Sequence, residues 1–541
     1  MASTVSNRFT LWDVAEIALL AAFFLLVAGG ATPDANEAHY LTKAKHFWNP
    51  DFGSRDFFLT SSDAHVVFYW TVGWLTQFFS LETTAWIGRF VIWILIAASV
   101  VRLTKTILPR QGGGLVAGVI FFVLQSNLHM AGEWVIGGAE AKGFAFALCF
   151  LALSHAITNR WAGVWWLLGV AMAFHVLVGG WFVVCIGAYW LIDWKIDRED
   201  HSGNEWLSVG VGIPFAIVGL WPAIMLSRGV STETIQMANW ISVHVRLPHH
   251  LLFTNFSLPR VTGFATLVLI GFGGCVWFYR KLPVTLRRMT MVCAASLFIA
   301  LTGVLIDWGL PDDSVWQHAL LKYYWFRTSD VMVPLLVSQV LVWCALRGYD
   351  RRHIPRWIIS AAFAGVLVGQ ITCIQWTRFW DPRPRGDSLV LPSARKVERM
   401  AQREMTLRIH RHWKTACAWL QRHSAADSVV LTPMRQQTFK WHAQRAEVVS
   451  RKDMPQDAVS LVRWFELYHS VYPVRNDRRG LRHLSNSEIY DRTRKYGADF
   501  VVISEFSPED QRRFESDPRF AKRFPPTGSF SFYAVYEVID E

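Results

Sequence analysis

Long apolar runs separated by short polar segments dominate the first 380 residues. Eleven such runs can be drawn, at residues 13–30, 86–107, 113–129, 139–157, 161–178, 180–194, 206–227, 261–279, 287–306, 331–347 and 355–376. A helix needs about 20 apolar residues to cross the hydrocarbon core of a bilayer, and these runs lack the alternation of a membrane β-strand. The pattern predicts about eleven spanning helices. The fifth and sixth are short, and a single re-entrant pair is the alternative there.

The pattern changes after Trp376. Residues 381–387, DPRPRGD, read as a linker, and a polar helix is expected at 396–423. Strand-like segments follow at 428–432, 499–504 and 530–538, with helical stretches near 456–470 and 486–496. We therefore expect a mostly α polytopic membrane domain over 1–380, with a first outer loop at 31–85, and a soluble α/β domain over 381–541 that can bury its own core.

Charge sets the expected orientation. The chain of 541 residues is 52% hydrophobic and 18% charged, with a net charge of +12. Much of this excess lies in alternate short loops, which excludes the nucleic-acid-binding class and instead satisfies the positive-inside rule. The basic positions are Arg102, Lys105, Arg110, Arg160, Lys195, Arg198, Arg280, Lys281, Arg287, Arg288, Arg347, Arg351, Arg352 and Arg356. We expect the N-terminus on the cytoplasmic side and the C-terminal domain on the outer side, in the periplasm or its equivalent.

Two apolar segments need separate treatment. The first run resembles a signal peptide, but its length and its early acids, Asp13 and Glu16, favour an uncleaved span. Segment 63–80 is short for a membrane span. Counting it as one would also move every later loop to the other side of the membrane and break the positive-inside rule, so we expect an interfacial helix there. The seven cysteines are scattered singly and indicate no disulfide framework.

Charged residues at membrane edges are costly and therefore candidates for function. Seven of them map to the outer half of the predicted bundle: Arg89, Glu140, Lys142, His175, Lys322, Arg327 and Asp330. A water-filled cavity that opens outward would explain this distribution. The alternative is that each side chain extends to nearby lipid headgroups.

The first outer loop supplies carboxylates. Thr32-Pro33-Asp34 has the residue types of a helix start. A helix from there would place Asp34 and Glu37 on one face, an arrangement that suits a general base or a divalent cation. Alternatively, Asp34 only complements a helix dipole. Asp56 is a further candidate in the same loop.

Two later segments carry cations. In VHVRLPHHL, Arg246, His249 and His250 flank a proline at expected headgroup depth, which suits a phosphate or pyrophosphate. An ordinary interfacial loop is the alternative. In the soluble domain, a polar run that includes Lys440 and Arg445 follows the strand at 428–432. It forms either a cap over the outward cavity or a packed surface.

Several short motifs together resemble the C-type (GT-C fold) membrane glycosyltransferases. That superfamily includes protein O-mannosyltransferases, oligosaccharyltransferase catalytic subunits and the lipid A aminoarabinose transferase, and within it the chain looks most like a bacterial multi-span group. The motifs are PDANEAHYL at 33–41, DFFLTSSDAHVVFYW at 56–70, GGAEAKGFAFAL at 137–148, VRLPHHL at 245–251, YYWFRTSDVMVPL at 323–335 and the segment 432–457.

The resemblance implies transfer of a sugar from a polyprenyl-phosphate or -diphosphate carrier to an acceptor at the outer face. It places the catalytic acid on Asp34, with Glu37 beside it, and a second acid on Glu140. Arg246 and Arg327 would hold the donor phosphate. The early outer loops contain no Asp-x-Asp motif, so a metal requirement stays open, as do the sugar and the acceptor. The alternative is a non-catalytic, transport or envelope-assembly protein of the same fold. Membrane lipids are expected partners in either case.

Overall fold

A computed structural model describes residues 10–196, 204–350, 355–387, 399–474, 480–504 and 512–539. The chain divides into two compact units. The first contains residues 1–29, 64–67 and 89–374, and the second contains 30–63, 68–88 and 375–541. The basic positions Arg198, Arg351 and Arg352, and the first residues of the helix expected at 396–423, lie outside the described residues.

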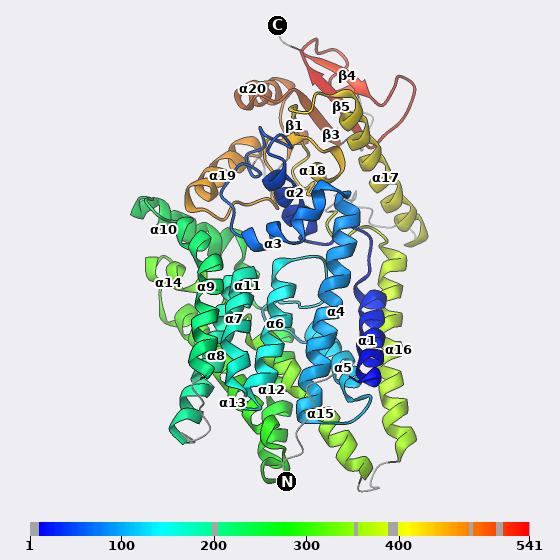
Figure 1. Cartoon of the computed structure of the whole chain (residues 1–541). Coiled ribbons are helices and arrows are strands. Elements are labelled where there is room, and N and C mark those ends of the chain that lie inside the picture. Colours follow the sequence, from blue (N-terminus) through cyan, green and yellow to red (C-terminus); the bar gives the residue numbers. More distant parts are fainter. Residues whose placement is uncertain are drawn as a thin grey trace. The chain divides into compact units, whose positions relative to one another are not determined.

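The first unit is a helical bundle (Figure 1). Each predicted apolar run coincides with one helix: α1 (Leu11–Ala28), α4 (Leu81–Ile107), α5 (Gly113–Asn127), α6 (Ala141–Ala156), α7 (Val164–Phe174), α8 (Val176–Ile196), α9 (Asn204–Met225), α12 (Leu258–Trp277), α13 (Val284–Gly309), α15 (Ser329–Asp350) and α16 (Arg356–Trp380). Among the described residues, eight of these are long and apolar enough to cross a membrane, and three are shorter. The expected multi-pass helical fold is therefore confirmed.

Short helical segments connect the longer ones in this unit. They are η2 (Trp161–Gly163), α10 (Thr232–Trp240), η4 (Ile241–Arg246), α11 (Pro248–Leu251), η5 (Phe253–Asn255), η6 (Tyr279–Lys281) and α14 (Val315–Leu321). Leu251, Leu252 and Leu321 join a small apolar cluster that packs α11 against α14. The polar segment 241–251 is thereby fixed to the bundle.

Glycines allow α7 and α9 to pack with their backbones in contact. A Cβ on Gly169 would lie 2.2 Å from the carbonyl oxygen of Gly212, and one on Gly212 would lie 2.5 Å from that of Trp165. Gly219 meets Met172 in the same way, at 2.2 Å. Small residues at such spacing are the usual means of close helix packing within a bilayer.

The two acids of α1 serve the bundle itself. Asp13 forms a capping box with Thr10 and an ion pair with Lys105 at 2.5 Å. The Glu16 carboxylate accepts the backbone N–H groups of Gly112, at 2.7 Å, and Leu115, at 3.0 Å. It thus caps the N-terminus of α5, where a helix favours negative charge.

The first outer loop, most of which belongs to the second unit, differs from the expectation. The helix α2 (Glu37–Trp48) begins at Glu37 after Asn36, so the predicted start at Thr32 is wrong. The single helix expected over 63–80 is also wrong, because α3 (Val66–Trp70) and the 3₁₀ segment η1 (Gly73–Gln77) are separated by a turn. Trp48 donates its indole N–H to the carbonyl of Tyr69 at 2.7 Å, which ties α2 to this turn-rich segment.

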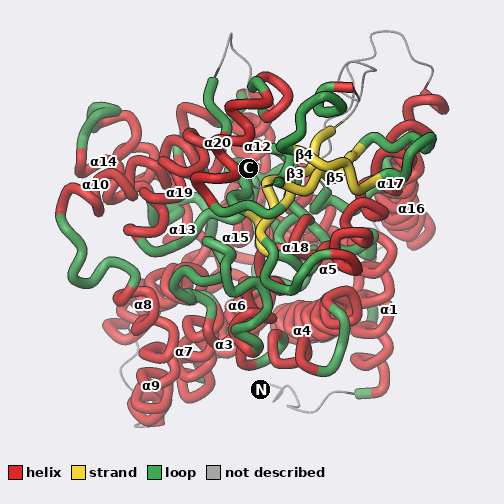
Figure 2. Tube along the Cα trace, turned by 90° about the horizontal axis from the view of Figure 1, so that it is seen from above, coloured by secondary structure: helices red, strands yellow, loops and turns green. Residues whose placement is uncertain are grey.

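The C-terminal part of the second unit is a five-stranded sheet with helices (Figure 2). Its elements are α17 (Arg399–His423), β1 (Val429–Leu431), α18 (Phe439–Ala443), β2 (Ala446–Glu447), α19 (Ala458–Val471), η7 (Leu481–His483), α20 (Asn486–Tyr496), β3 (Phe500–Ser504), β4 (Phe520–Phe524) and β5 (Tyr533–Val538). The strand order is β2-β1-β3-β5-β4. β1 is parallel to β2 and β3, whereas β5 is antiparallel to β3 and β4.

The core of this sheet explains which elements the sequence could predict. Trp413, Cys417 and Leu420 of α17 pack on Val430, Val502 and Val535, so the apolar face of that helix and the three predicted strands form one cluster. β2 and β4 were not expected. β2 has two residues, and β4, FAKRF, exposes its charged centre at the sheet edge, where charges commonly protect unpaired strands.

Candidate functional site

A buried ion cluster lies at one end of the helical bundle, centred on Glu133. This residue belongs to the loop between α5 and α6, and its side chain is 4% exposed. Oε1 accepts a hydrogen bond from Lys142 Nζ at 2.8 Å, and Oε2 accepts one from Arg327 Nε at 2.6 Å. Glu140 lies 3.6 Å from the same ammonium group. Two cations from α6 and from the segment before α15 thus share one carboxylate.

Asp330 fixes the loop that carries Glu133. Its carboxylate accepts the backbone N–H groups of Met130 and Ala131, both at 2.8 Å, and of Glu133 at 3.3 Å. Because all three donors are backbone groups, Asp330 holds the loop against the start of α15. The side chain acts on the cluster through the position of Glu133.

Histidines complete the cluster. His250 Nδ1 lies 2.5 Å from the Ala131 carbonyl, which can only accept, so this nitrogen carries the proton. Gly132 packs against the same ring, and a Cβ there would lie 3.1 Å from it. His175 Nε2 lies 3.4 Å from Arg327 Nη1, and its ring contacts that of His65 at 5.5 Å between centroids.

Electrostatics separates the roles of these groups. Burial alone would raise the pKa of Glu133, but Arg327 and Lys142 outweigh it and lower the pKa to about 2. Burial, together with the neighbouring His249, lowers the pKa of His250 to about 4. At neutral pH, Glu133 is therefore a carboxylate and His250 a neutral ring with Nε2 as an acceptor. A neutral His250 can serve the site through hydrogen bonds.

The other cation candidates in this unit are His249, Arg246, Lys322 and Arg89. The His249 ring lies beside that of His250, tilted and with ring centroids 4.1 Å apart, and Arg246 ends the segment η4. Lys322 donates to the Asn239 side chain at 3.0 Å, next to α10. Arg89 is fully buried in α4. Of the expected residues, the structure therefore brings together Glu140, Lys142, His175, His250, Arg327 and Asp330.

Glu133, the centre of this cluster, was not among the residues expected from the sequence. It stands in a short outer loop, MAGEWVIGG, as an acid between a glycine and a tryptophan. The rule that selected Glu140 and Lys142, that charges at membrane edges are costly, applies equally to this position. That signal was sufficient to find it.

The second unit positions the acids of the first outer loop. Asp34 lies just before α2 and is 6% exposed, and its backbone N–H donates to Glu37 Oε2 at 2.7 Å. The Arg385 guanidinium lies 3.6 Å from Asp34 Oδ1. Glu37 is fully buried. The two acids are adjacent through this backbone contact, and Asp34 is the one that meets an exposed cation.

A second buried cluster surrounds Lys440 of α18. Its ammonium lies 2.6 Å from Asp453, 2.7 Å from Glu447 and 3.4 Å from Asp56. His39 of α2 lies 3.1 Å from the other oxygen of Asp453. Asp56 also accepts the backbone N–H groups of Phe58, Leu59 and Glu447, at 3.0, 2.9 and 3.0 Å. The first outer loop is thus joined to the sheet through buried charge.

The charges in this second cluster are unequal. Burial alone would lower the pKa of Lys440, but Asp453, Asp56 and Glu447 raise it well above its ordinary value. Burial raises the pKa of Glu447 to about 7, whereas Lys440 and His39 outweigh burial at Asp453 and lower its pKa. Lys440 is therefore a fixed cation, and Glu447 is the carboxyl group that accepts a proton near neutrality.

Arg445 has a structural environment. Its guanidinium donates to the carbonyls of Gln421 and Ser424 at the end of α17, at 2.6 and 2.9 Å, and to the Ser424 hydroxyl at 3.0 Å. It joins β2 to that helix end. Among the described residues, no group of three or more His, Cys, Asp or Glu side chains is arranged to hold a metal ion.

Comparisons with known proteins give one family model and several similar structures. A domain of unknown function, DUF6798, matches residues 411–471. A search of curated protein sequences finds no match. The structure of ArnT from Cupriavidus metallidurans bound to undecaprenyl phosphate is similar over 98% of each chain, with 13% sequence identity and a TM-score of 0.47.

A second similar structure is the archaeal oligosaccharyltransferase AglB from Archaeoglobus fulgidus, in complex with an inhibitory peptide and a dolichol-phosphate. It matches 98% of this chain and 74% of its own, with 13% identity and a TM-score of 0.47. The resemblance to the GT-C glycosyltransferases therefore stays a prediction from the sequence motifs. Similarity at this level carries no argument about the reaction, and the residues described above must carry it.

Proposed function

We propose that this protein is an integral membrane glycosyltransferase that moves a sugar from a polyprenyl-phosphate-linked donor to an acceptor. The observation that carries the proposal is the buried cluster in which Lys142 and Arg327 share Glu133 at one end of an apolar bundle. Two fixed cations at the end of a lipid-facing bundle suit the phosphate of a lipid whose chain lies along the helices.

The chemistry assigns opposite tasks to acid and cation. A base removes the acceptor proton while the acceptor oxygen forms its bond to the anomeric carbon. The bond between that carbon and the phosphate oxygen breaks, and the lipid phosphate leaves with the electron pair. Lys142 and Arg327 would stabilise the charge that develops on this leaving group. Glu133 would hold Arg327 in position, and Asp330 would hold the loop that carries Glu133.

Asp34 is the proposed base, as its place in the PDANEAHYL motif implies. Its support is local: a nearly buried carboxylate whose oxygen meets Arg385 at 3.6 Å in a segment held by Glu37. Glu140 is the proposed second acid, 3.6 Å from Lys142. The proposal also places the N-terminus in the cytoplasm and the second unit outside an inner membrane, as the charge distribution of the loops favours.

The test is transfer from a polyprenyl-phosphate sugar in nanodiscs that contain the full chain. D34N should reduce turnover by roughly 10²- to 10⁴-fold, the usual contribution of a general base. D51N changes an exposed acid of the same loop and should leave turnover unchanged. R327K should keep part of the activity that R327Q loses, because only the lysine retains a positive charge.

Protein folding is checked by the melting midpoint and by gel filtration of each variant. Wild-type turnover in a folded D34N protein would show that Asp34 is not the base. Wild-type turnover in both D34N and R327Q would end the transferase proposal in favour of the transport or envelope-assembly alternative.

A further inference from the structure

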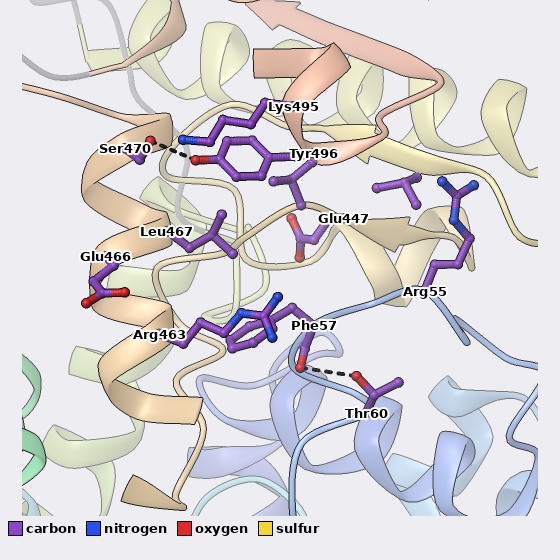
Figure 3. Close-up of a pocket in the computed structure, with 12 residues that line it drawn as sticks. Arg55, Phe57, Thr60, Glu447, Arg463, Glu466, Leu467, Ser470, Lys495 and Tyr496 are labelled. Atoms are coloured by element: carbon purple, nitrogen blue, oxygen red, sulfur yellow. Dashed lines mark hydrogen bonds between the residues drawn. The ribbon is translucent and has the colours of Figure 1, made fainter. Parts of the chain in front are cut away.

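The second unit contains a cavity that neither ion cluster explains. Its volume is about 520 Å³, within the range of roughly 300 to 1,000 Å³ that is usual for small-molecule sites. Three parts of the unit form its wall: the first outer loop, the β1–β2 edge of the sheet, and the facing sides of α19 and α20 (Figure 3). The lining residues are Arg55, Phe57, Thr60, Val429, Glu447, Val448, Arg463, Glu466, Leu467, Ser470, Lys495 and Tyr496.

Cations dominate the polar rim of this cavity. Arg55 is occupied, because it donates to the Gly497 carbonyl at 2.9 Å and lies 3.3 Å from Asp499. Arg463 and Lys495 come from the two facing helices. In the part of the chain that the structure describes, no carboxylate forms an ion pair with either of these two side chains. Their charges are therefore available to a ligand.

The acids of the cavity do not cancel this charge. Glu447 forms part of the wall, but its oxygens are taken by Lys440, at 2.7 Å, and by the Thr432 hydroxyl, at 2.8 Å. Burial raises its pKa to about 7, so a neutral Glu447 is accessible near physiological pH. Glu466 is exposed on α19. The cavity thus offers two unpaired cations and one exposed acid.

Rings and hydroxyl groups supply the remaining surface. The Arg463 guanidinium lies over the Phe57 ring, 5.4 Å from its centroid, and the Tyr496 hydroxyl donates to Ser470 at 2.7 Å. Figure 3 shows Phe57 beside Arg463, and Tyr496 on the side of the cavity near Ser470. Aromatic faces pack on the C–H faces of sugar rings, and hydroxyl and carboxylate groups bond sugar hydroxyls. A simple inorganic anion would use only the cations.

We propose that this cavity binds an anionic sugar, a saccharide unit that carries a carboxylate or a phosphate. Arg463 and Lys495 hold the anionic group, and Phe57 and Tyr496 contact the ring. The site lies within the second unit and needs no donor lipid. Its test is therefore independent of the transfer reaction.

The test is calorimetric titration of the full-length protein in detergent, with glucuronate and glucose 1-phosphate as probes. At least one probe should bind at least tenfold more tightly than both glucose and inorganic phosphate. R463Q and K495Q should each weaken that probe about tenfold or more, because each removes a charge-assisted hydrogen bond. R422Q, which removes an exposed arginine of α17 outside the cavity, should change nothing.

A further variant separates the ring from the anion. F57A should weaken the sugar probe and leave the affinity for inorganic phosphate unchanged. Four results would overturn the proposal: no binding of either probe, equal binding of glucose, equal binding of inorganic phosphate, or wild-type affinity in both R463Q and K495Q. The comparison of glucuronate with glucose 1-phosphate then identifies which anionic group the cavity prefers.

Discussion

At Lys440, one ammonium group faces three buried carboxylates, and this geometry predicts the consequence of removing it. K440M should lower the free energy of unfolding of the second unit by about 3–5 kcal/mol, the usual cost of leaving buried charge without its partner. The loss should be smaller at pH 5 than at pH 8, because protonation of the stranded carboxylates removes the uncompensated charge. Hydrogen exchange of peptides from α18 and β2 measures the local stability.

The matched variant for this prediction is K495M, which removes an exposed lysine of the same unit. It should leave exchange in α18 and β2 unchanged at both pH values. Equal protection in K440M and the wild type would show that the cluster contributes nothing to stability.

His250 gives a pH dependence with a defined sign. Its pKa in the folded protein, about 4, lies below that of an unfolded histidine, about 6.5. Between these values the unfolded chain binds more protons, so stability falls as pH falls through this window. H250N abolishes the effect. Its loss of stability between pH 7 and pH 5 should therefore be about 2 kcal/mol smaller than that of the wild type.

Unfolding by increasing SDS at pH 7 and pH 5 measures this difference. H423N, at an exposed histidine of α17, should retain the wild-type dependence. If H250N and the wild type lose the same stability on acidification, His250 is not the group that senses pH in this window.

At the residue scale, the sequence supplied the charged positions and the structure supplied their partners. Glu140, Lys142, Arg327 and Asp330 were expected because charge at a membrane edge is costly. That cost does not reveal that Asp330 binds three backbone N–H groups of a loop about 200 positions away in the sequence. Arg445 was expected from a polar run, and the structure shows that it bonds the end of α17. The sequence of a polar run does not tell whether its side chains face a cavity or bond a helix end.

At the scale of elements, the contact between α7 and α9 depends on three glycines, Gly169, Gly212 and Gly219. A leucine at Gly212 would place its Cβ within 2.5 Å of the Trp165 carbonyl, which forces the helices apart. G212L should destabilise the bundle by at least the roughly 1–3 kcal/mol of an overpacked core. G169L should do the same from the other helix.

Gly210 provides the control on the same helix, because nothing lies within 4 Å of a Cβ built there. G210L should therefore melt within about 2 °C of the wild type, as expected for a surface substitution away from packed contacts. Thermal unfolding in detergent gives the ranking. Equal midpoints for G212L and G210L would mean that the close contact does not stabilise the bundle.

Which elements could be predicted follows from their length. Each of the eleven apolar runs coincides with a helix, and eight of these helices have the length and composition that crossing a membrane requires. The short elements of the loops follow local rules that tertiary contacts override. Thr32-Pro33-Asp34 has the residue types of a helix start, yet α2 begins at Glu37. The Glu37 side chain accepts the Asp34 backbone N–H from within the first turn.

At the scale of the whole molecule, the distribution of basic residues predicts orientation. The loop that follows α12 contains Arg280 and Lys281, and cytoplasmic loops are enriched in such residues. Residues 31–85 and the C-terminal part should then lie on the opposite side of the membrane. A cysteine at Asp51 or Arg422, both exposed, should react with a membrane-impermeant thiol reagent in intact spheroplasts, whereas one at Lys281 should react only after permeabilisation.

The native cysteines make this experiment practicable. Five of the seven are buried, Cys344 is partly exposed, and Cys373 is exposed, so C344S/C373S is a suitable background. Labelling of K281C in intact spheroplasts, with D51C protected, would reverse the orientation and place Asp34 on the cytoplasmic side. Since the proposed donor is used at the outer face, that result would also require a different location for the reaction. Agreement at all three positions would put the acids of the first outer loop and the anionic-sugar cavity on the same side of the membrane.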